Sequence, residues 1–265
     1  MKGSNYLIVN NQEISIPIAT TSENELLNFE FTKECGISLV TGRPGSGKST
    51  IIRLIIAGLL KKKMKNSFEI FLVDTTGYEF SEISNFSSEC LKGTLRGIDK
   101  KDIEDFIDEL YINFIEKVEC LSDIQFGEFE RNIEFKPVQS IFVFIDDVYM
   151  MLNNLTSQEH INKFTTLITH GAKYGFRFVL LCQNYDCAYI KLPVIREMIG
   201  QRIQLSPYTI EDVLDFCKDA TVAGDIGDDE EHFTVLITKK DGRQIKKGEL
   251  FYINLEEFQN VIKMI

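Results

Sequence analysis

Short stretches of alternating apolar and polar residues occupy the start of the chain. The segments 6–10 (YLIVN), 13–19 (EISIPIA) and 26–32 (LLNFEFT) follow this period-two pattern and are separated by turn-forming residues. A period of two is typical of strands that have one buried face. We therefore expect three short strands within residues 1–35, which form a small accessory sheet packed on the rest of the chain.

From residue 36 onward, short continuous apolar runs alternate with segments of helical spacing. This alternation predicts an α/β fold, with a mostly parallel sheet and helices on both of its faces. The predicted strands are GISLVT, FEIFLVD, IFVFIDD, FRFVLLCQN and RIQLSP, and the predicted helices are STIIRLIIAGLLKKKMK, 99–119, 157–173, a short one in KLPVIREMIG, and TIEDVLDFC. Residues 232–254 predict a hairpin that turns at Asp241 and Gly242, and LEEFQNVIKMI predicts a last helix.

Composition and charge narrow the class of protein. The chain has 265 residues, of which 44% are hydrophobic and 26% are charged, as is usual for a globular domain. No apolar run reaches the roughly 18 residues of a transmembrane helix. The net charge of −11 disfavours tight binding to nucleic acid, which depends on Lys and Arg that neutralise phosphates. The six cysteines contain no CxxC pair, so we predict neither a disulfide framework nor a zinc site.

Residues 41–50 read TGRPGSGKST and match G-x-x-x-x-G-K-[ST] between an apolar strand and a helix. Phosphates need several backbone N–H groups aimed at one point, which glycine permits, and the helix N-terminus adds positive charge. We predict that ATP binds here, with Lys48 on the β- and γ-phosphates and the Ser49 hydroxyl on Mg²⁺. The alternative is a glycine-rich turn without a ligand. The predicted nucleotide-binding residues are Gly42, Arg43, Pro44, Gly45, Ser46, Gly47, Lys48, Ser49 and Thr50.

Polar side chains end two of the later apolar strands. In open α/β sheets, ligands bind outside the carboxyl ends of the strands. Asp146, at the end of IFVFIDD, is therefore the predicted second Mg²⁺ ligand beside Ser49. Asp147 is predicted to orient the attacking water, and Gln183, after FVLLC, to contact the γ-phosphate, so these two are the predicted catalytic residues. The alternative is that all three are only polar strand ends.

A full strand and helix, FEIFLVD and 99–119, lie between the phosphate loop and Asp146. This order suggests that another strand separates the two in the sheet, as in RecA-like P-loop NTPases with an additional strand. We predict that residues 36–265 form such a domain and that residues 1–35 add strands to it, as one domain overall.

From about residue 13 to its end, the chain resembles the FtsK/SpoIIIE-type motor ATPases. The resemblance rests on EISIPIA, LVTGRPGSGKST, FLVD, IFVFIDD, THGAKYGFRFVLLCQN and GQRIQLSPYTIEDVLDFC. The phosphate loop indicates P-loop proteins in general, whereas the segment from Gly175 to Arg202 indicates this family.

The chain departs from the family pattern at several positions. Asp147 stands where the family has Glu, and Ala172 stands where it usually has Arg. Asn184 follows Gln183 where Arg-Pro is common, and 75–76 is Thr-Thr where Pro-Lys is usual. A DNA translocase should keep those groups. The pattern most resembles the EssC/EccC coupling ATPases of type VII secretion, whose C-terminal ATPase domains are often degenerate.

The resemblance implies a cytoplasmic ATPase domain of a membrane-anchored bacterial protein. It also implies further ATPase domains in the same polypeptide, a hexameric working assembly, and small helical secreted proteins as cargo. We expect no stable nucleic-acid partner and weak hydrolysis by the isolated domain.

Two other functions stay open from the sequence. One is a module that holds a nucleotide without turnover and recognises a substrate. The other is a DNA translocase, for which a cluster of cations near the predicted 241–242 turn is the relevant feature. The cluster contains Lys239, Lys240, Arg243, Lys246 and Lys247. Such a run of charges is also typical of a solvated hairpin.

Overall fold

The computed structural model describes residues 13–32, 36–61, 68–77, 80, 83, 90–97, 99–126, 139–183, 192–206, 234–239 and 245–263. Its strands are β1 (Ile14–Thr20), β2 (Leu26–Phe31), β3 (Ile37–Thr41), β4 (Glu69–Asp74), β5 (Leu91–Arg96), β6 (Ile141–Asp146), β7 (Phe176–Cys182), β8 (Ile199–Leu205), β9 (Thr234–Lys239) and β10 (Ile245–Leu250). Its helices are α1 (Lys48–Lys61), α3 (Lys100–Phe126), α4 (Val148–Asn154), α5 (Gln158–His170), the 3-10 helix η1 (Gly171–Tyr174), α6 (Val194–Met198) and α9 (Leu255–Lys263).

One mixed sheet contains all ten of these strands, in the order β2-β1-β10-β9-β8-β3-β7-β6-β4-β5. The half from β8 to β5 is parallel, and the half from β8 to β2 is antiparallel. Every residue of β3, β6, β7 and β8 is buried, as their continuous apolar runs predict.

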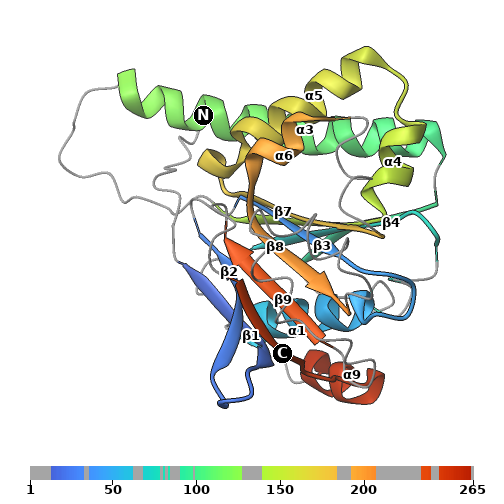
Figure 1. Ribbon diagram of the computed structural model, residues 1–265. Helices are drawn as coiled ribbons and strands as arrows, with labels where there is room; N and C mark the ends of the chain where they lie inside the picture. The colour runs from blue at the N-terminus through green and yellow to red at the C-terminus, as the bar shows by residue number, and fades with distance from the viewer. Residues whose placement is uncertain are drawn as a thin grey trace.

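Helices cover both faces of the sheet (Figure 1). Apolar side chains of α1 and α9 pack on one face, and those of α3, α4, α5 and α6 pack on the other. Side chains alternate between the two faces along a strand, so each central strand contributes to both layers of the core. Val40 of β3 joins the α1 side, for example, while Leu39 joins the α3 side. The predicted α/β fold with two helical layers is confirmed.

The order of the central strands places β7 between β3 and β6. Leu39 of β3 pairs with Leu180 of β7, and Val143 of β6 pairs with Phe178 of β7. The strand that carries the phosphate loop and the strand that carries Asp146 are therefore not neighbours, which confirms the prediction of an additional strand.

The N-terminal strands β1 and β2 pair with each other antiparallel, Ile14 opposite Phe31. They do not form an accessory sheet of their own, because β1 also pairs with β10, Ala19 opposite Leu250. β9 and β10 form the predicted hairpin, and β9 joins it to β8. The hairpin thus links the N-terminal strands to the parallel half of the sheet.

Other segments differ from the expectation or lie outside the described residues. The edge strand β5 was missed, because its half-exposed residues lack a continuous apolar run. α3 extends further than predicted, to Phe126, and the helix predicted over 157–173 ends at His170 and continues as η1. The predicted strand at 6–10, the helix TIEDVLDFC and the 241–242 turn lie outside the described residues.

A close contact at Gly58 joins α1, the helix that follows the phosphate loop, to β1. A Cβ atom at residue 58 would lie 2.5 Å from Cγ2 of Ile16. We expect Gly58→Ala to lower the free energy of unfolding by about 1–2 kcal/mol, because overpacking outweighs the gain of roughly 1 kcal/mol in helix propensity. Urea denaturation measures this difference. In an Ile16→Ala background the same substitution should be neutral or stabilising, and equal effects in both backgrounds would contradict the packing argument.

Candidate functional site

A glycine-rich loop, residues 42–47, connects the carboxyl end of β3 to the N-terminus of α1. Gly45 and Gly47 have φ values of 81° and 100°, which side chains other than glycine rarely adopt. The N–H of Ser46 donates to the carbonyl oxygen of Arg43 at 3.1 Å, and the N–H of Ile51 donates to that of Gly47 at 3.0 Å. These bonds close the turn and start the helix, so the loop sits at the positive end of α1.

The Lys48 side chain spans the loop. Its Nζ atom donates to the carbonyl oxygens of Gly42 at 2.7 Å and Arg43 at 3.0 Å. Lys48 is also the first residue of α1, where the backbone N–H groups of the helix end have no intrahelical partner. A cation in this position can bind an anion held by the loop.

Two features of the loop are compatible with a bound phosphate group. Within the described part of the chain, the buried Ser46 Oγ has no hydrogen-bond partner. A buried hydroxyl without a partner is destabilising, and a phosphate oxygen would satisfy it. A Cβ atom at residue 42 would lie 2.3 Å from this Oγ, so Gly42 is needed for the close approach of the loop to itself. The residues present are therefore compatible with ATP.

The tips of β3, β7 and β6 form one continuous edge of the sheet, with the predicted site residues along it. Gly42 N–H donates to the carbonyl oxygen of Cys182, the last residue of β7, at 3.3 Å. Gln183 follows Cys182 and is exposed to solvent, while Asp146 ends β6 and is buried. The fold therefore brings the loop, Gln183 and Asp146 to the same edge, as the sequence predicts; their roles stay predictions.

Two side chains at this edge carry oxygen atoms of the kind that bind Mg²⁺. Among the described residues, no group of three or more His, Cys, Asp or Glu side chains could hold a metal ion. Mg²⁺ is commonly bound by one or two protein oxygens together with phosphate and water. Ser49, in the first turn of α1, and Asp146 could supply such oxygens.

Asp147 has a structural role that the sequence did not reveal. Its backbone is left-handed, with φ 50° and ψ 68°, and its carboxylate accepts a hydrogen bond from the Met150 N–H at 3.1 Å. Asp147 is thereby the N-cap of α4. A non-glycine residue in this conformation is uncommon and costs about 1 kcal/mol or more. The predicted role in orienting water stays a prediction, and it would compete with the cap for the same carboxylate.

Two further residues at this edge were not predicted as site residues. The Asp74 carboxylate, at the tip of β4, is fully buried and accepts hydrogen bonds from Gly77 N–H at 2.8 Å and Phe80 N–H at 2.9 Å. The hydroxyl of Thr75 donates to the backbone oxygen of Asp146 at 3.1 Å. An apolar run that ends in Asp, FLVD, was the available signal, since IFVFID has the same form.

Ala172 lies at the opposite end of β7 from the phosphate loop. It belongs to η1, which precedes β7, whereas the loop contacts Cys182 at the far end of that strand. Seven strand residues span about 20 Å, beyond the reach of any side chain. An arginine at position 172 would therefore lie too far from the phosphate loop of the same chain to neutralise charge there.

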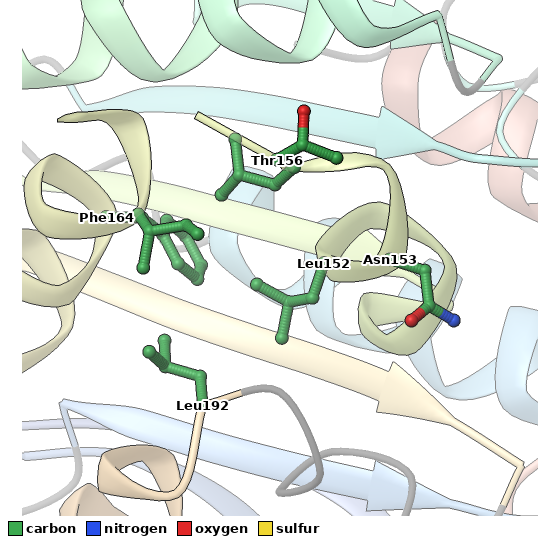
Figure 2. A pocket seen from close by; sticks show the side chains of 7 residues that line it. Leu152, Asn153, Thr156, Phe164 and Leu192 are labelled. Atoms are coloured by element: carbon green, nitrogen blue, oxygen red, sulfur yellow. The ribbon is translucent and has the colours of Figure 1, made fainter. Parts of the chain in front are cut away.

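A separate cavity lies in the helical layer that contains α4 and α5 (Figure 2). Its volume is about 310 Å³, and its lining includes Leu152, Ile161, Phe164 and Leu192. None of the lining side chains is titratable, so the cavity offers no acid, base or charged metal ligand. The predicted site residues lie outside this cavity.

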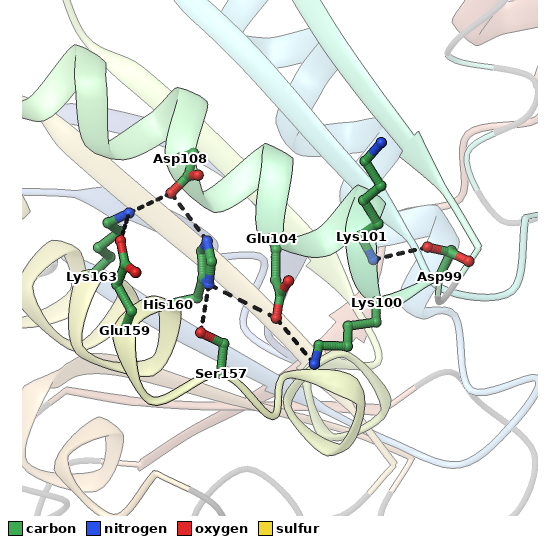
Figure 3. A network of polar contacts seen from close by, with 9 residues as sticks. All are labelled: Asp99, Lys100, Lys101, Glu104, Asp108, Ser157, Glu159, His160 and Lys163. Carbon is green, nitrogen blue, oxygen red and sulfur yellow. Dashed lines mark hydrogen bonds and ion pairs between the residues drawn. The ribbon is translucent and has the colours of Figure 1, made fainter.

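A polar network joins α3 to α5 in the same layer (Figure 3). Asp108 of α3 accepts a hydrogen bond from Lys163 at 2.8 Å and lies 3.3 Å from Nε2 of His160. The hydrogen bond from Lys163 is the main cause that lowers the pKa of Asp108, and the two carboxylates of Asp108 and Glu159 raise the pKa of Lys163 to about 12. All these groups pair with each other, so the network is a link between helices.

The comparisons with known proteins agree with this geometry. The model of the FtsK/SpoIIIE family matches residues 9–222. No curated protein matches the chain significantly. Within the described residues, no helix is long and apolar enough to cross a membrane.

Several solved structures share the fold at low sequence identity. The cytoplasmic domain of the type VII secretion ATPase EccC from Thermomonospora curvata is 14% identical, with a TM-score of 0.71, over 99% of this chain and 32% of that one. The conjugation coupling protein TcpA of pCW3, solved with ATPγS, is 18% identical, with a TM-score of 0.69, over 99% of this chain and 75% of that one. ATPases 2 and 3 of Thermomonospora curvata EccC, in complex with a signal sequence peptide, are 15% identical, with a TM-score of 0.60, over 96% of this chain and 44% of that one. The chain thus spans about a third of the EccC cytoplasmic domain.

Proposed function

The chain belongs to the FtsK/SpoIIIE family, and on this premise we propose that it is an ATP-binding motor domain of a protein-secretion coupling ATPase. The observation that carries the proposal is the loop at 42–47, with Lys48 across it and Asp146 two strands away on the same edge. Residues 36–265 would be the RecA-like domain, and residues 1–35 would extend it.

Each proposed role follows from the chemistry of the residue. The loop N–H groups and Lys48 bind the phosphates, and the Ser46 hydroxyl adds a donor. Ser49 and Asp146 supply oxygens to Mg²⁺, and the bound metal would neutralise charge that develops on the phosphates. Gln183 would contact the γ-phosphate from the strand between them, and Asp147 would orient water when it releases its cap.

The link to secretion is supported by the structures of EccC and EssC that share the fold. One of those EccC structures holds a signal sequence peptide. We propose that this chain is a cytoplasmic domain of a membrane-anchored bacterial protein with further ATPase domains. Its partners would be those domains, small helical secreted proteins of the type VII system, and other copies in a hexamer.

Phosphate release and nucleotide affinity, measured with and without a candidate secreted protein, test this function. The motor proposal predicts Mg²⁺-dependent ATP binding and turnover that the secreted protein raises. Tight binding without turnover under all conditions would instead identify a recognition module that holds its nucleotide. No binding of ATP in the presence of Mg²⁺ would overturn both.

DNA translocation is the second candidate, because the conjugation coupling protein TcpA and the DNA-packaging ATPase B204 share the fold. Exposed cations, Lys246 and Lys247, lie on β10. Lys239 is in β9, and the side chains of Lys239, Lys240 and Arg243 lie outside the described residues.

We expect only weak binding to duplex DNA at about 150 mM salt. The net charge of −11 opposes each phosphate contact, and non-specific affinity falls steeply with salt. A mobility-shift titration measures the affinity, with Lys246→Gln/Lys247→Gln as the variant and Lys100→Gln/Lys101→Gln on α3 as the matched control. Micromolar binding that only the β10 variant abolishes would favour the translocase.

A further inference from the structure

We infer that Thr75 is a positioning residue for the proposed nucleotide site, which it serves by holding the peptide bond between Asp146 and Asp147. This inference rests on the proposed function of those two aspartates. It begins with the sheet register. Asp74 of β4 and Asp146 of β6 are the last residues paired between these strands. Beyond them, the Thr75 hydroxyl donates to the backbone oxygen of Asp146 at 3.1 Å and links the two strands past their last paired residues.

The Asp74 carboxylate holds Thr75 in place. One carboxylate oxygen accepts hydrogen bonds from the Thr76 hydroxyl at 2.9 Å and the Gly77 N–H at 2.8 Å, and the other accepts from the Phe80 N–H at 2.9 Å. A fully buried carboxylate with three donors is a strong local constraint on the backbone that follows it. Because Thr75 is also buried and is stiff at χ1, its hydroxyl has a defined direction.

The peptide bond that Thr75 holds is the one that separates the two proposed roles. Its carbonyl belongs to Asp146, the proposed metal ligand, and its N–H belongs to Asp147, the proposed water-orienting residue. Asp147 is left-handed, with φ 50°, a conformation that relaxes unless its surroundings hold it. A hydrogen bond to the preceding carbonyl opposes that relaxation. It thereby sets both the direction of the Asp146 side chain and the cap that Asp147 makes to Met150.

The identity of the residue matters for this role. Position 75 is one of the positions at which the chain departs from the family pattern, because the family usually has proline there. Proline has no hydroxyl to donate, so the contact to Asp146 is a feature of this chain. Serine would keep the donor, whereas valine would keep the shape and lose it.

The decisive experiment compares wild type with Thr75→Val, Thr75→Ser and the control Thr165→Val. The Thr165 hydroxyl donates to a backbone oxygen of α5 at 2.7 Å, so this control loses an equivalent bond in the helical layer. Mn²⁺ affinity is measured by electron paramagnetic resonance in the presence of ATPγS, and ATPγS affinity is measured in EDTA. We expect Thr75→Val to weaken Mn²⁺ binding about two- to tenfold, with the metal-free affinity for ATPγS unchanged. Thr75→Ser and Thr165→Val should match wild type.

Amide hydrogen exchange at Met150 supplies a readout that needs no nucleotide. Thr75→Val should speed this exchange, because the cap from Asp147 loosens, and Thr75→Ser should not. Equal Mn²⁺ affinity in wild type and Thr75→Val, or a loss that serine does not restore, overturns the inference. If wild type binds no ATPγS at all, the proposed function fails instead. In that case the positioning role is still tested by hydrogen exchange at Met150, and unchanged exchange in Thr75→Val overturns it.

Discussion

Replacement of Lys48 by alanine is expected to weaken the binding of Mg·ATP by about 10- to 100-fold, since hydrogen bonds between charged groups are among the stronger ones. The Lys48 ammonium group lies across the loop, 2.7 Å from the Gly42 carbonyl oxygen and 3.0 Å from that of Arg43. Alanine removes both the cation for the phosphates and the bonds that close the loop. Titration of a fluorescent ATP analogue measures the loss.

Lys61→Ala is the matched control for this substitution. Lys61 is the last residue of the same helix and is exposed, so its removal leaves the loop unchanged. Circular dichroism and a thermal melt of both variants separate a loss of binding from a loss of fold. If Lys48→Ala binds the analogue as tightly as wild type and Lys61→Ala do, the loop is not a working phosphate site.

Slow hydrolysis by the isolated domain, below about 1 s⁻¹, is the second large effect that we expect. Correct placement of a base or water-orienting group contributes roughly 10²- to 10⁴-fold. The Asp147 side chain is one methylene shorter than the glutamate that the family usually has at this position. Its carboxylate also already accepts a hydrogen bond from the Met150 N–H at 3.1 Å. Steady-state phosphate release measures the rate. Turnover by the domain alone at the roughly 1–100 s⁻¹ that is common for enzymes would contradict this expectation.

Two substitutions at Asp147 separate its cap from its proposed chemistry. Asp147→Asn keeps a good N-cap and tolerates the left-handed conformation but removes the negative charge, so stability should hold and turnover should not rise. Asp147→Glu lengthens the side chain but is a poor cap. We expect it to raise turnover while it lowers the free energy of unfolding by about 1 kcal/mol. If Asp147→Glu leaves the rate of a slow wild type unchanged, geometry at 147 is not the defect, and a missing partner or unassembled hexamer becomes the leading cause.

The position of Ala172 bears on that last outcome. Residue 172 lies at the end of β7 that is remote from the phosphate loop of its own chain. A side chain there is too far from that loop to act on a nucleotide bound by the same chain. The sequence showed that residue 172 departs from the family pattern. Which part of the molecule a side chain at 172 can reach depends on the course of β7.

Several elements were predictable because their signal is local. β3, β6, β7 and β8 are continuous apolar runs, and burial on both faces of a parallel sheet imposes that pattern on each strand separately. β5 gave no such signal, because Gly93 interrupts it and its residues are only half-buried at the edge. An edge strand has fewer neighbours, so its composition is less constrained.

The amino-acid sequence by itself determined the phosphate loop, because the six residues and the lysine that form it are consecutive and their backbone requirements are met by glycine at particular positions. It also determined the class of fold, because strand and helix periods are read within a few residues. The sequence suggested that a strand separates the loop from Asp146, but only the tertiary structure identified that strand as β7 and showed that β10 joins the N-terminal strands to the sheet. It alone placed the Thr75 hydroxyl on Asp146 and the Asp147 carboxylate on α4. Such contacts depend on strand order and register, which arise from packing between segments far apart in the chain and leave no periodic mark in any one of them.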